Sequence, residues 1–435
     1  MLALTNFELH HPALLCKSFS SGAIEALEFC ANCVRGGMIN SERPRIRLRP
    51  NAMVQKFRHG FPWVYDNELV MDRRSRKIAP GSFAVLESAE RQPLALVTVN
   101  PASKIVARVL ARDPEVQIDQ AWITARLQTA LALRERLYDA PFYRLVHAEA
   151  DGFPGVIIDR FGDTAVIQPN AVWAENCIEM LCAALVAVTG VKCVLKNAAG
   201  RARSLEGLDG ENAVLFGAAP ETPVPVEMSG AVYMADLQAG QKTGLFYDQR
   251  PNHAFAAKLA KGARVLDVFS HVGGFALAAL AGGASAALAV DSSAAALELA
   301  QQGAEAGGVT ARFDTRKGDA FEVLGALAES GARFDLVICD PPAFAASKPA
   351  LEAGLRAYEK LARLAAPLVD EGGYLGLCSC SHAADLTRFR AASLRGIGRA
   401  GRASALIHTG FAGPDHPVHP QLAESHYLKA LFFRL

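Results

Sequence analysis

The stretch RVLDVFSHVGGFALAAL, residues 264–280, decides the fold. It begins with a short apolar run around Leu266, which is long enough for a buried strand and too short for a helix. Ser270, Gly273 and Gly274 break this pattern, and the alanine-rich apolar segment that follows predicts a helix. A strand, a glycine turn and a helix form a ligand crevice in an open α/β sheet. The spacing fits neither G-x-G-x-x-G nor a P-loop, so the stretch predicts an adenosine-type cofactor without naming it.

The chain on either side of this stretch alternates between strand-like and helix-like segments. This alternation predicts an α/β fold over residues 225–435, with a doubly wound, mostly parallel, Rossmann-like sheet. The expected strands are residues 264–269, 286–291, 334–339, 374–378 and 427–433.

The earlier part of the chain predicts two further domains, because 435 residues are too many for one. Residues 41–113 predict a small β domain, with strands at 45–49, 83–86 and 95–99. Residues 114–224 predict a central α+β domain. Residues 1–40 fit none of these patterns and predict a poorly ordered N-terminal extension.

The composition is that of a soluble globular protein, with 51% hydrophobic and 20% charged residues and a net charge of +1. Nine irregularly spaced cysteines predict a reduced, cytoplasmic protein. A CxxC pair, Cys30 and Cys33, lacks the second pair of a zinc site, and no other cluster predicts a metal. No apolar run is long enough to cross a membrane. The sequence leaves open whether the chain forms a homodimer.

Although the net charge of the whole chain is small, one region near the N-terminus is strongly basic. Residues 35–77 contain eleven basic and four acidic residues. Arg45 and Arg47 alternate with apolar residues, and Arg58 stands close to Trp63. Cations beside aromatic rings suit phosphate contact and base stacking, so we expect these residues to bind RNA. The alternative is a solvated basic edge that deters aggregation.

Acidic residues stand where several expected strands end. Asp291 lies 24 residues after Asp267, near the offset at which a carboxylate accepts ribose hydroxyls. Asp319 could contact an adenine amino group. Asp340 opens the motif Asp340-Pro-Pro-Ala-Phe344, whose prolines fix the backbone and remove two amide donors. A lone acid here is usually a helix cap, but three on successive strands predict a lined crevice.

A cysteine follows the next expected strand, in Cys378-Ser-Cys380-Ser-His382. Cys378 and Cys339 occupy strand positions and predict inert core residues. Cys380 falls where the strand gives way to a loop, on the side of the sheet that Asp340 occupies. We therefore expect Cys380 to be a nucleophile, and His382 could favour its thiolate.

These motifs resemble, in order, those of the RlmI-type 23S rRNA large-subunit methyltransferases. The resemblance covers residues 43–435. It departs from the family at His271, where a tyrosine is more usual, and at Ala423, where a proline is expected. The matching motifs are Gly60–Tyr65, Asp151–Gly155, Lys242–Arg250, Asp267–Phe275, Asp340–Phe344, Ser379–Ser381, Asp415–Val418 and Tyr427–Lys429.

The resemblance implies an S-adenosylmethionine-dependent enzyme that makes 5-methylcytosine in 23S rRNA or in a large-subunit assembly intermediate. Its N-terminal domain would be a PUA domain. Cys380 would be the catalytic nucleophile, and Asp340 would hydrogen-bond the base edge. The implied cofactor-binding residues are Arg250, Asp267, Phe269, Ser270, Gly273, Gly274, Asp291, Asp319 and Asp340.

Two other functions remain open on the sequence. One is a guanine methyltransferase, which keeps the cofactor site and makes Cys380 structural. The other is an RNA-binding protein with an inactive methyltransferase fold, which the glycine turn, Asp291 and Asp340 argue against. The sequence does not name the modified nucleotide.

Overall fold

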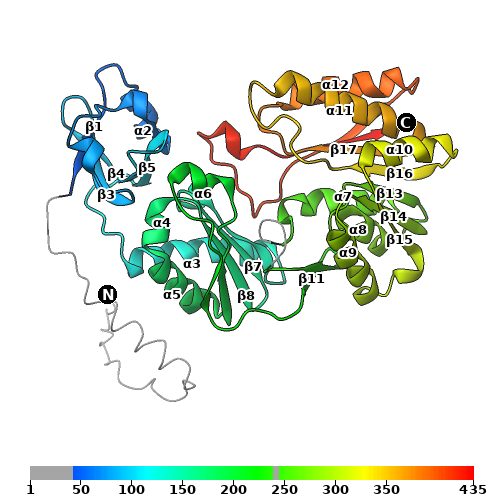
Figure 1. Cartoon of the computed structure of the whole chain (residues 1–435), viewed down its shortest axis with the longest axis horizontal. Helices are drawn as coiled ribbons and strands as arrows, with labels where there is room; N and C mark the ends of the chain where they lie inside the picture. The colour runs from blue at the N-terminus through cyan, green and yellow to red at the C-terminus, as the bar shows by residue number, and fades with distance from the viewer. Residues whose placement is uncertain (1–42, 239–243) are drawn as a thin grey trace, which may run out of the picture. The chain divides into compact units, whose positions relative to one another are not determined.

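The computed structural model describes residues 43–238 and 244–435. The predicted extension, with Cys30 and Cys33, lies outside the described residues, as do Lys242 and Thr243. Pro44–Leu435 form one unit, which contains two five-stranded sheets, a two-stranded hairpin and a seven-stranded sheet in chain order (Figure 1).

The first sheet is a small β structure with strand order β1-β3-β4-β5-β2. The predicted alternation at its start is confirmed, because Ile46 and Leu48 are buried while Arg45 is exposed and Arg47 is half-buried. Two strands were not expected: β2 has only three residues, and β5 carries Arg108 at its centre. The elements are β1 (Arg45–Arg47), α2 (Val54–Arg58), β2 (Trp63–Tyr65), β3 (Ser82–Glu87), β4 (Pro93–Val99) and β5 (Ile105–Ala111).

The second sheet has the order β10-β9-β8-β7-β6 and lies in the central region. Its core contains the buried side chains of Ile123, Leu127, Trp173 and Leu185, which come from three different helices. The elements are α3 (Gln120–Leu137), β6 (Phe142–His147), β7 (Val156–Phe161), β8 (Thr164–Pro169), α4 (Val172–Asn176), α5 (Ile178–Thr189), β9 (Cys193–Lys196), α6 (Arg201–Glu206) and β10 (Ala213–Phe216).

The third sheet has the order β15-β14-β13-β16-β17-β19-β18, after a hairpin of β11 (Val224–Met228) and β12 (Ala231–Ala235). The first five strands are parallel, and β19 is antiparallel to both neighbours. The elements are α7 (Arg250–Leu259), β13 (Arg264–Val268), α8 (Gly274–Ala281), β14 (Ala286–Asp291), α9 (Ala294–Ala306), β15 (Phe313–Lys317), α10 (Ala320–Glu329), β16 (Phe334–Cys339), α11 (Leu351–Ala365), β17 (Val369–Ser379), α12 (Leu386–Arg399), β18 (Ala405–Gly410) and β19 (Lys429–Arg434).

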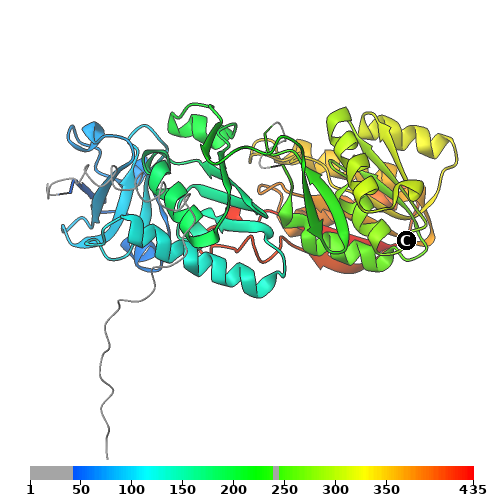
Figure 2. The ribbon, with the colours of Figure 1, turned by 90° about the horizontal axis from the view of Figure 1, so that it is seen from below.

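Helices cover both faces of this sheet, which confirms the predicted doubly wound fold (Figures 1 and 2). Val265 of β13 packs in a core with α7, α8 and α9. The next residue, Leu266, packs in a second core with α10, α11 and α12. Successive side chains of a strand point to opposite faces, so burial of both requires a helical layer on each side.

Two strands of the sheet lie outside the five expected ranges. The segment of β15, Phe-Asp-Thr-Arg-Lys, is mostly polar and exposed, and β18 is largely exposed at the opposite edge. Edge strands need not be apolar, so neither produces a buried hydrophobic run. Across the described residues, no helix is both long and apolar enough to cross a membrane.

Candidate functional site

A tight turn between β13 and α8 forms the centre of the candidate site. The Asp267 carboxylate is fully buried and accepts the backbone N–H groups of Phe275 (3.1 Å) and Ala276 (2.9 Å). It therefore satisfies amides in the first turn of α8, where a helix favours negative charge. Burial raises the pKa of Asp267 to about 7, against the opposite effect of these two hydrogen bonds.

The backbone of this turn is strained. Phe269 (φ 64°) and His271 (φ 50°) adopt left-handed conformations that residues with a Cβ rarely take. Gly273 (φ 80°) does so without strain. A Cβ on Gly274 would lie 2.9 Å from His253 Nε2, so a larger residue would have to displace this buried ring. Two strained non-glycine residues in one turn indicate a functional constraint.

The strand register places two of the predicted acidic residues on either side of the turn. Val268 lies opposite Val290 of β14 and Cys339 of β16. Asp291 ends β14, and Asp340 follows β16 directly. Because parallel strands end at the same edge, both residues flank the glycine turn.

Two of the predicted acidic residues hold backbone amides. The Asp291 carboxylate accepts the N–H groups of His271 (2.9 Å) and Ser293 (2.8 Å), which ties it to the turn. Asp319 accepts the N–H of Phe321 (2.9 Å) at the start of α10, so it caps a helix one strand further out. The two residues are therefore placed differently: Asp291 belongs to the turn, and Asp319 to the neighbouring helix.

Three phenylalanine rings gather beside the turn. The ring centres of Phe269, Phe321 and Phe344 are separated by 6.1–6.5 Å. Sequence reasoning named only Phe269, although Phe321 and Phe344 stand just after two predicted acids, Asp319 and Asp340. Aromatic side chains at a crevice suit a flat heterocyclic ligand.

A chain of amide side chains orients Asp340. Gln249 Nε2 donates to Asp340 Oδ2 (2.9 Å), and Asn252 Nδ2 donates to Gln249 Oε1 (2.7 Å). Asn252 thereby fixes which end of the Gln249 amide faces the carboxylate. The Asp340 N–H donates to Val268 O (3.1 Å), which holds the backbone at the crevice. Sequence reasoning did not single out Gln249 or Asn252.

Cys380 follows β17 at the next strand end. Of the six cysteines that the structure describes, Cys380 alone is partly exposed. Cys339 and Cys378 are buried, and burial raises the pKa of both thiols. Because β16 and β17 are parallel neighbours, the residue after each, Asp340 and Cys380, lies at the same edge of the sheet. His382 is exposed.

Buried hydroxyl groups fix the residues on both sides of Cys380. Ser379 Oγ donates to the Tyr358 hydroxyl (2.9 Å), which lies 2.8 Å from Ser381 Oγ. Ser381 Oγ also accepts the N–H of Ala345 (3.0 Å). These bonds join α11, the loop after β16 and the turn that carries Cys380. Sequence reasoning missed Tyr358, which stands within a helix and far from any quoted motif.

Arg250 does not join this group of side chains. Its guanidinium carbon lies 4.1 Å from the centre of the Tyr138 ring and 5.4 Å from that of Tyr247. Its Nη2 donates to the carbonyl oxygen of Phe142. The guanidinium therefore faces the central region.

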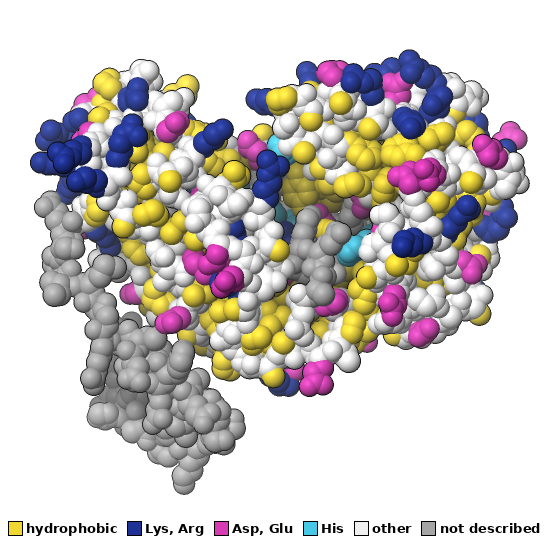
Figure 3. All heavy atoms as spheres, in the orientation of Figure 1, with side chains coloured by type: hydrophobic (Ala, Val, Ile, Leu, Met, Phe, Trp, Pro, Cys, Tyr) yellow, Lys and Arg dark blue, Asp and Glu magenta, His cyan; other side chains and the backbone are white. Residues whose placement is uncertain are grey.

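The residues expected to bind RNA lie on the first sheet but do not form one group. Arg45 pairs with Glu87 (2.7 Å), and Arg58 is exposed at the end of α2. Trp63 Nε1 donates to Glu149 (2.8 Å), so its indole faces the central region. Figure 3 shows Lys and Arg side chains gathered over the first sheet.

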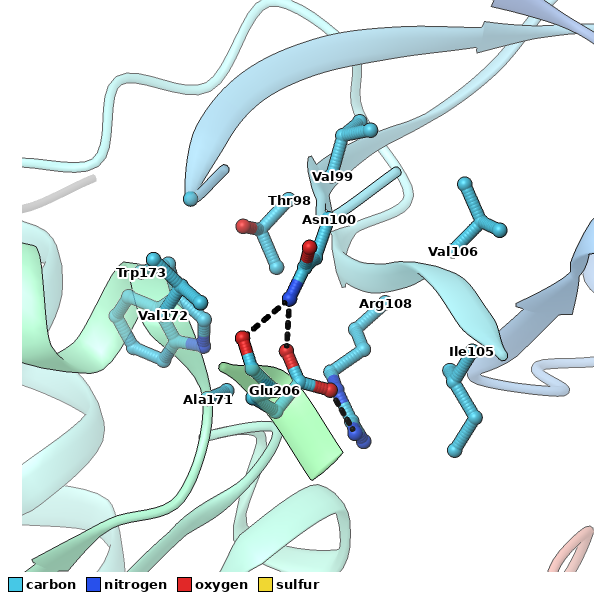
Figure 4. A pocket seen from close by; sticks show the side chains of 11 residues that line it. Thr98, Val99, Asn100, Ile105, Val106, Arg108, Ala171, Val172, Trp173 and Glu206 are labelled. Atoms are coloured by element: carbon cyan, nitrogen blue, oxygen red, sulfur yellow. Dashed lines mark hydrogen bonds and ion pairs between the residues drawn. The ribbon is translucent and has the colours of Figure 1, made fainter. Parts of the chain in front are cut away.

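Ion pairs and hydrogen bonds link this sheet to the central region. Arg108 pairs with Glu149 and Glu206 (3.0 Å each), and Asn100 Nδ2 donates to Glu206 Oε2 (2.9 Å). Figure 4 shows the Glu206 side of this junction around a pocket of about 10 Å³. That volume holds at most one water molecule, so the junction connects two regions and has no room for a ligand.

Comparisons with known proteins agree with this layout. The chain matches the family of S-adenosylmethionine-dependent methyltransferases over residues 176–434 and the PUA-like domain family over residues 46–112. It is 36% identical to a ribosomal RNA large subunit methyltransferase of Deinococcus radiodurans, over 91% of this chain and 98% of that protein. It is 33% identical to ribosomal RNA large subunit methyltransferase I of Escherichia coli, over 86% of this chain and 95% of that protein.

Solved structures show the same fold. A SAM-dependent methyltransferase from Streptococcus mutans has a TM-score of 0.76 at 20% identity, over 90% of this chain and all of that one. A methyltransferase complexed with SAH also has a TM-score of 0.76, at 21% identity over 91% of this chain and all of that one.

The turn fits the cofactor of the matched family, S-adenosylmethionine. Asp267 Oδ1 and Ser270 Oγ are buried and have no hydrogen-bond partner among the described residues. Unpaired buried oxygens are rare in folded proteins, so they indicate groups that a ligand or water completes. The Asp291 carboxylate is tied to this turn at the end of β14, the neighbouring strand, where a carboxylate can accept ribose hydroxyls in a sheet of this kind.

Proposed function

The chain belongs to the S-adenosylmethionine-dependent methyltransferases, together with the ribosomal RNA large subunit methyltransferases that it matches, and on this premise we propose that it methylates carbon 5 of a cytosine in 23S rRNA. The names of these relatives support rRNA as the substrate. The observation that supports a cytosine target is Cys380, a partly exposed thiol after β17, at the same edge of the sheet as Asp340.

S-adenosylmethionine supplies a methyl group that its sulfonium makes a good electrophile. In this proposal the strained turn holds the cofactor, Asp291 accepts its ribose hydroxyls and Asp319 contacts its adenine amino group. Pairing of Arg250 with the cofactor carboxylate stays a prediction, because this guanidinium contacts Tyr138 and Phe142. The remaining proposed cofactor-binding residues are Asp267, Phe269, Ser270, Gly273, Gly274 and Asp340.

The proposed chemistry needs a nucleophile because carbon 5 of cytosine does not react by itself. The Cys380 thiolate forms a bond to carbon 6, and the displaced electron pair makes carbon 5 nucleophilic. Carbon 5 then takes the methyl group. Loss of the carbon 5 proton and cleavage of the sulfur–carbon bond restore the ring and the thiolate. A soft thiolate suits both the addition and the departure.

Asp340 would hydrogen-bond the base edge at the ring nitrogen or the exocyclic amine. Its orientation by Gln249 supports this role, because a carboxylate held before the reaction stabilises developing charge without reorganisation. The target base has to be unstacked or single-stranded to reach such a crevice.

The N-terminal region would hold structured RNA during this step. Arg45, Arg47 and Arg58 supply positive charge for phosphates, and the PUA-like match supports RNA contact. An opening of about 170 Å³ beside Trp63, lined also by His147 and other residues, supports the stacking of a base on this indole.

The test is to incubate the protein and cofactor with rRNA that contains 5-fluorocytidine. Fluorine at carbon 5 cannot leave as a proton does, so the adduct accumulates as a stable covalent complex. We expect Cys380→Ala to abolish this complex and Cys182→Ala, a buried cysteine of the central region, to retain it.

The other outcomes point to the two alternatives. Methylation of rRNA without any adduct would exclude the cysteine mechanism and favour a guanine target. Failure to bind the cofactor would favour an inactive fold that only binds RNA.

A further inference from the structure

A buried lysine stands beside the turn that carries Cys380. Lys429 begins β19 and lies directly opposite Ser379 of β17 in the antiparallel register. Only 4% of the residue is exposed. Its Nζ donates to the carbonyl oxygens of Ser381 (2.7 Å) and Ala384 (2.8 Å). One side chain thus ties together both ends of the loop between β17 and α12.

This lysine is unusual because its ammonium is buried without a carboxylate partner. Among the described residues, no Asp or Glu forms an ion pair with Lys429, and both of its hydrogen-bond acceptors are neutral carbonyls. Buried charges are normally paired, since burying an isolated ion is costly. A buried, unpaired cation therefore needs a reason other than stability.

The charged and titratable groups around Cys380 come from four places in the chain. Tyr358 of α11, Tyr427 before β19 and Lys429 all interact electrostatically with Cys380. Asp385, at the start of α12, interacts with Lys429. Burial lowers the pKa of Lys429 to about 8, while Cys380 and Asp385 act in the opposite direction. At neutral pH, Lys429 is the one cation of this group.

We propose that Lys429 is a positioning residue for Cys380: it fixes the nucleophile's turn through two carbonyls and supplies the positive charge against which the thiolate forms. This inference rests on the proposed role of Cys380. At neutral pH the thiol proton passes to solvent, the ammonium keeps its own proton, and the sulfur electron pair is then available to attack carbon 6. The hydroxyls of Tyr358, Ser379 and Ser381 hold the same turn but carry no charge.

The test follows alkylation of Cys380 by iodoacetamide in the full-length protein between pH 6 and pH 10. Mass spectrometry of the Cys380 peptide separates this thiol from the other cysteines. An opposite charge at close range shifts a titration by about one unit or more, so we expect Lys429→Met to raise the half-maximal pH by at least that much. Lys429→Arg should stay near the wild type, and Lys261→Met is the matched control at an exposed position.

Cofactor binding and circular dichroism identify any variant that fails to fold. If Lys429→Met does not fold, Lys429→Gln replaces it, since this side chain keeps a donor and loses the charge. An alkylation profile identical to the wild type in the folded, uncharged variant would overturn the proposal. The measurement uses no RNA, so it judges Lys429 even where the fluorocytidine adduct fails to form.

Discussion

The substitution Asp267→Asn tests the electrostatics of the glycine turn. Asparagine is nearly isosteric, and its carbonyl oxygen can still accept the N–H groups of Phe275 and Ala276. What it removes is a titratable group that is fully buried. The effect of the substitution should therefore depend on pH.

The direction and the size of this pH dependence of stability follow from the raised pKa of Asp267. A carboxyl with a folded pKa of about 7 and an unfolded pKa of roughly 3.9 binds its proton more tightly in the folded protein. The stability it contributes is complete below roughly pH 4 and is lost as the pH rises through 7. Between pH 5 and pH 8 the loss amounts to about 2.5 kcal/mol. Asparagine stays neutral at every pH, so the variant does not show this loss of stability.

The assay compares thermal unfolding of the variant and the wild type at pH 5 and pH 8, without cofactor. For a domain of this size, about 2.5 kcal/mol corresponds to about 5–10 °C. We expect the Tm of Asp267→Asn, relative to the wild type, to be higher at pH 8 than at pH 5 by that amount. Ser270→Ala, a neutral buried change in the same turn, should shift Tm equally at both pH values. A Tm difference for Asp267→Asn that is the same at pH 5 and pH 8 would refute the reasoning.

Three further predictions concern other parts of the molecule. Tyr358→Phe removes the hydroxyl that bonds Ser379 Oγ and Ser381 Oγ, which costs about 1–3 kcal/mol. Thermal unfolding should therefore show a loss of stability of this size with cofactor affinity unchanged, and an unaltered Tm would contradict this. Arg134→Leu removes the cation that pairs with the Asp151 carboxylate, whose side chain is only 8% exposed. Thermal unfolding should therefore show a loss of about 3–5 kcal/mol. A Tm within 2 °C of the wild type, roughly the effect of under 1 kcal/mol, would count against it. A triple charge reversal combines Arg45→Glu, Arg47→Glu and Arg58→Glu. It should weaken RNA binding and flatten the salt dependence of that binding, and an unchanged salt slope would exclude these positions as phosphate contacts.

The fold was predictable where burial leaves a pattern in the sequence. Central strands such as β13 and β16 are buried on both faces and appear as continuous apolar runs, which is why their positions were expected. The edge strands β15 and β18 pack on fewer sides and carry polar or exposed residues, so no such run marks them. The missing strands therefore follow from the physics of an open sheet.

The site was predictable only where its residues follow strands. Asp291, Asp340 and Cys380 each come directly after an apolar run, and the parallel register brings them to one edge. Tyr358 and Lys429 act from a helix and from an antiparallel strand, so their positions depend on pairings between distant segments. The contacts of Trp63 and Arg250 with the central region likewise depend on residues far away in the sequence, so no local pattern marks them.

The segment between β18 and β19 links the central region to the turn that carries Cys380. Arg134 Nη2 donates to the Asp415 carbonyl (2.9 Å), and the Asp415 carboxylate accepts the N–H of Arg144 (3.1 Å). Further along, the Tyr427 hydroxyl donates to Asp248 (2.7 Å), immediately before Gln249 and its bond to Asp340. Two residues after Tyr427 the chain reaches Lys429, which holds the turn of Cys380. Arg134 and the backbone of Arg144 thus anchor the segment that leads into β19. If Cys380 is the nucleophile, a change at these contacts in the central region should reach the turn that carries it through this segment.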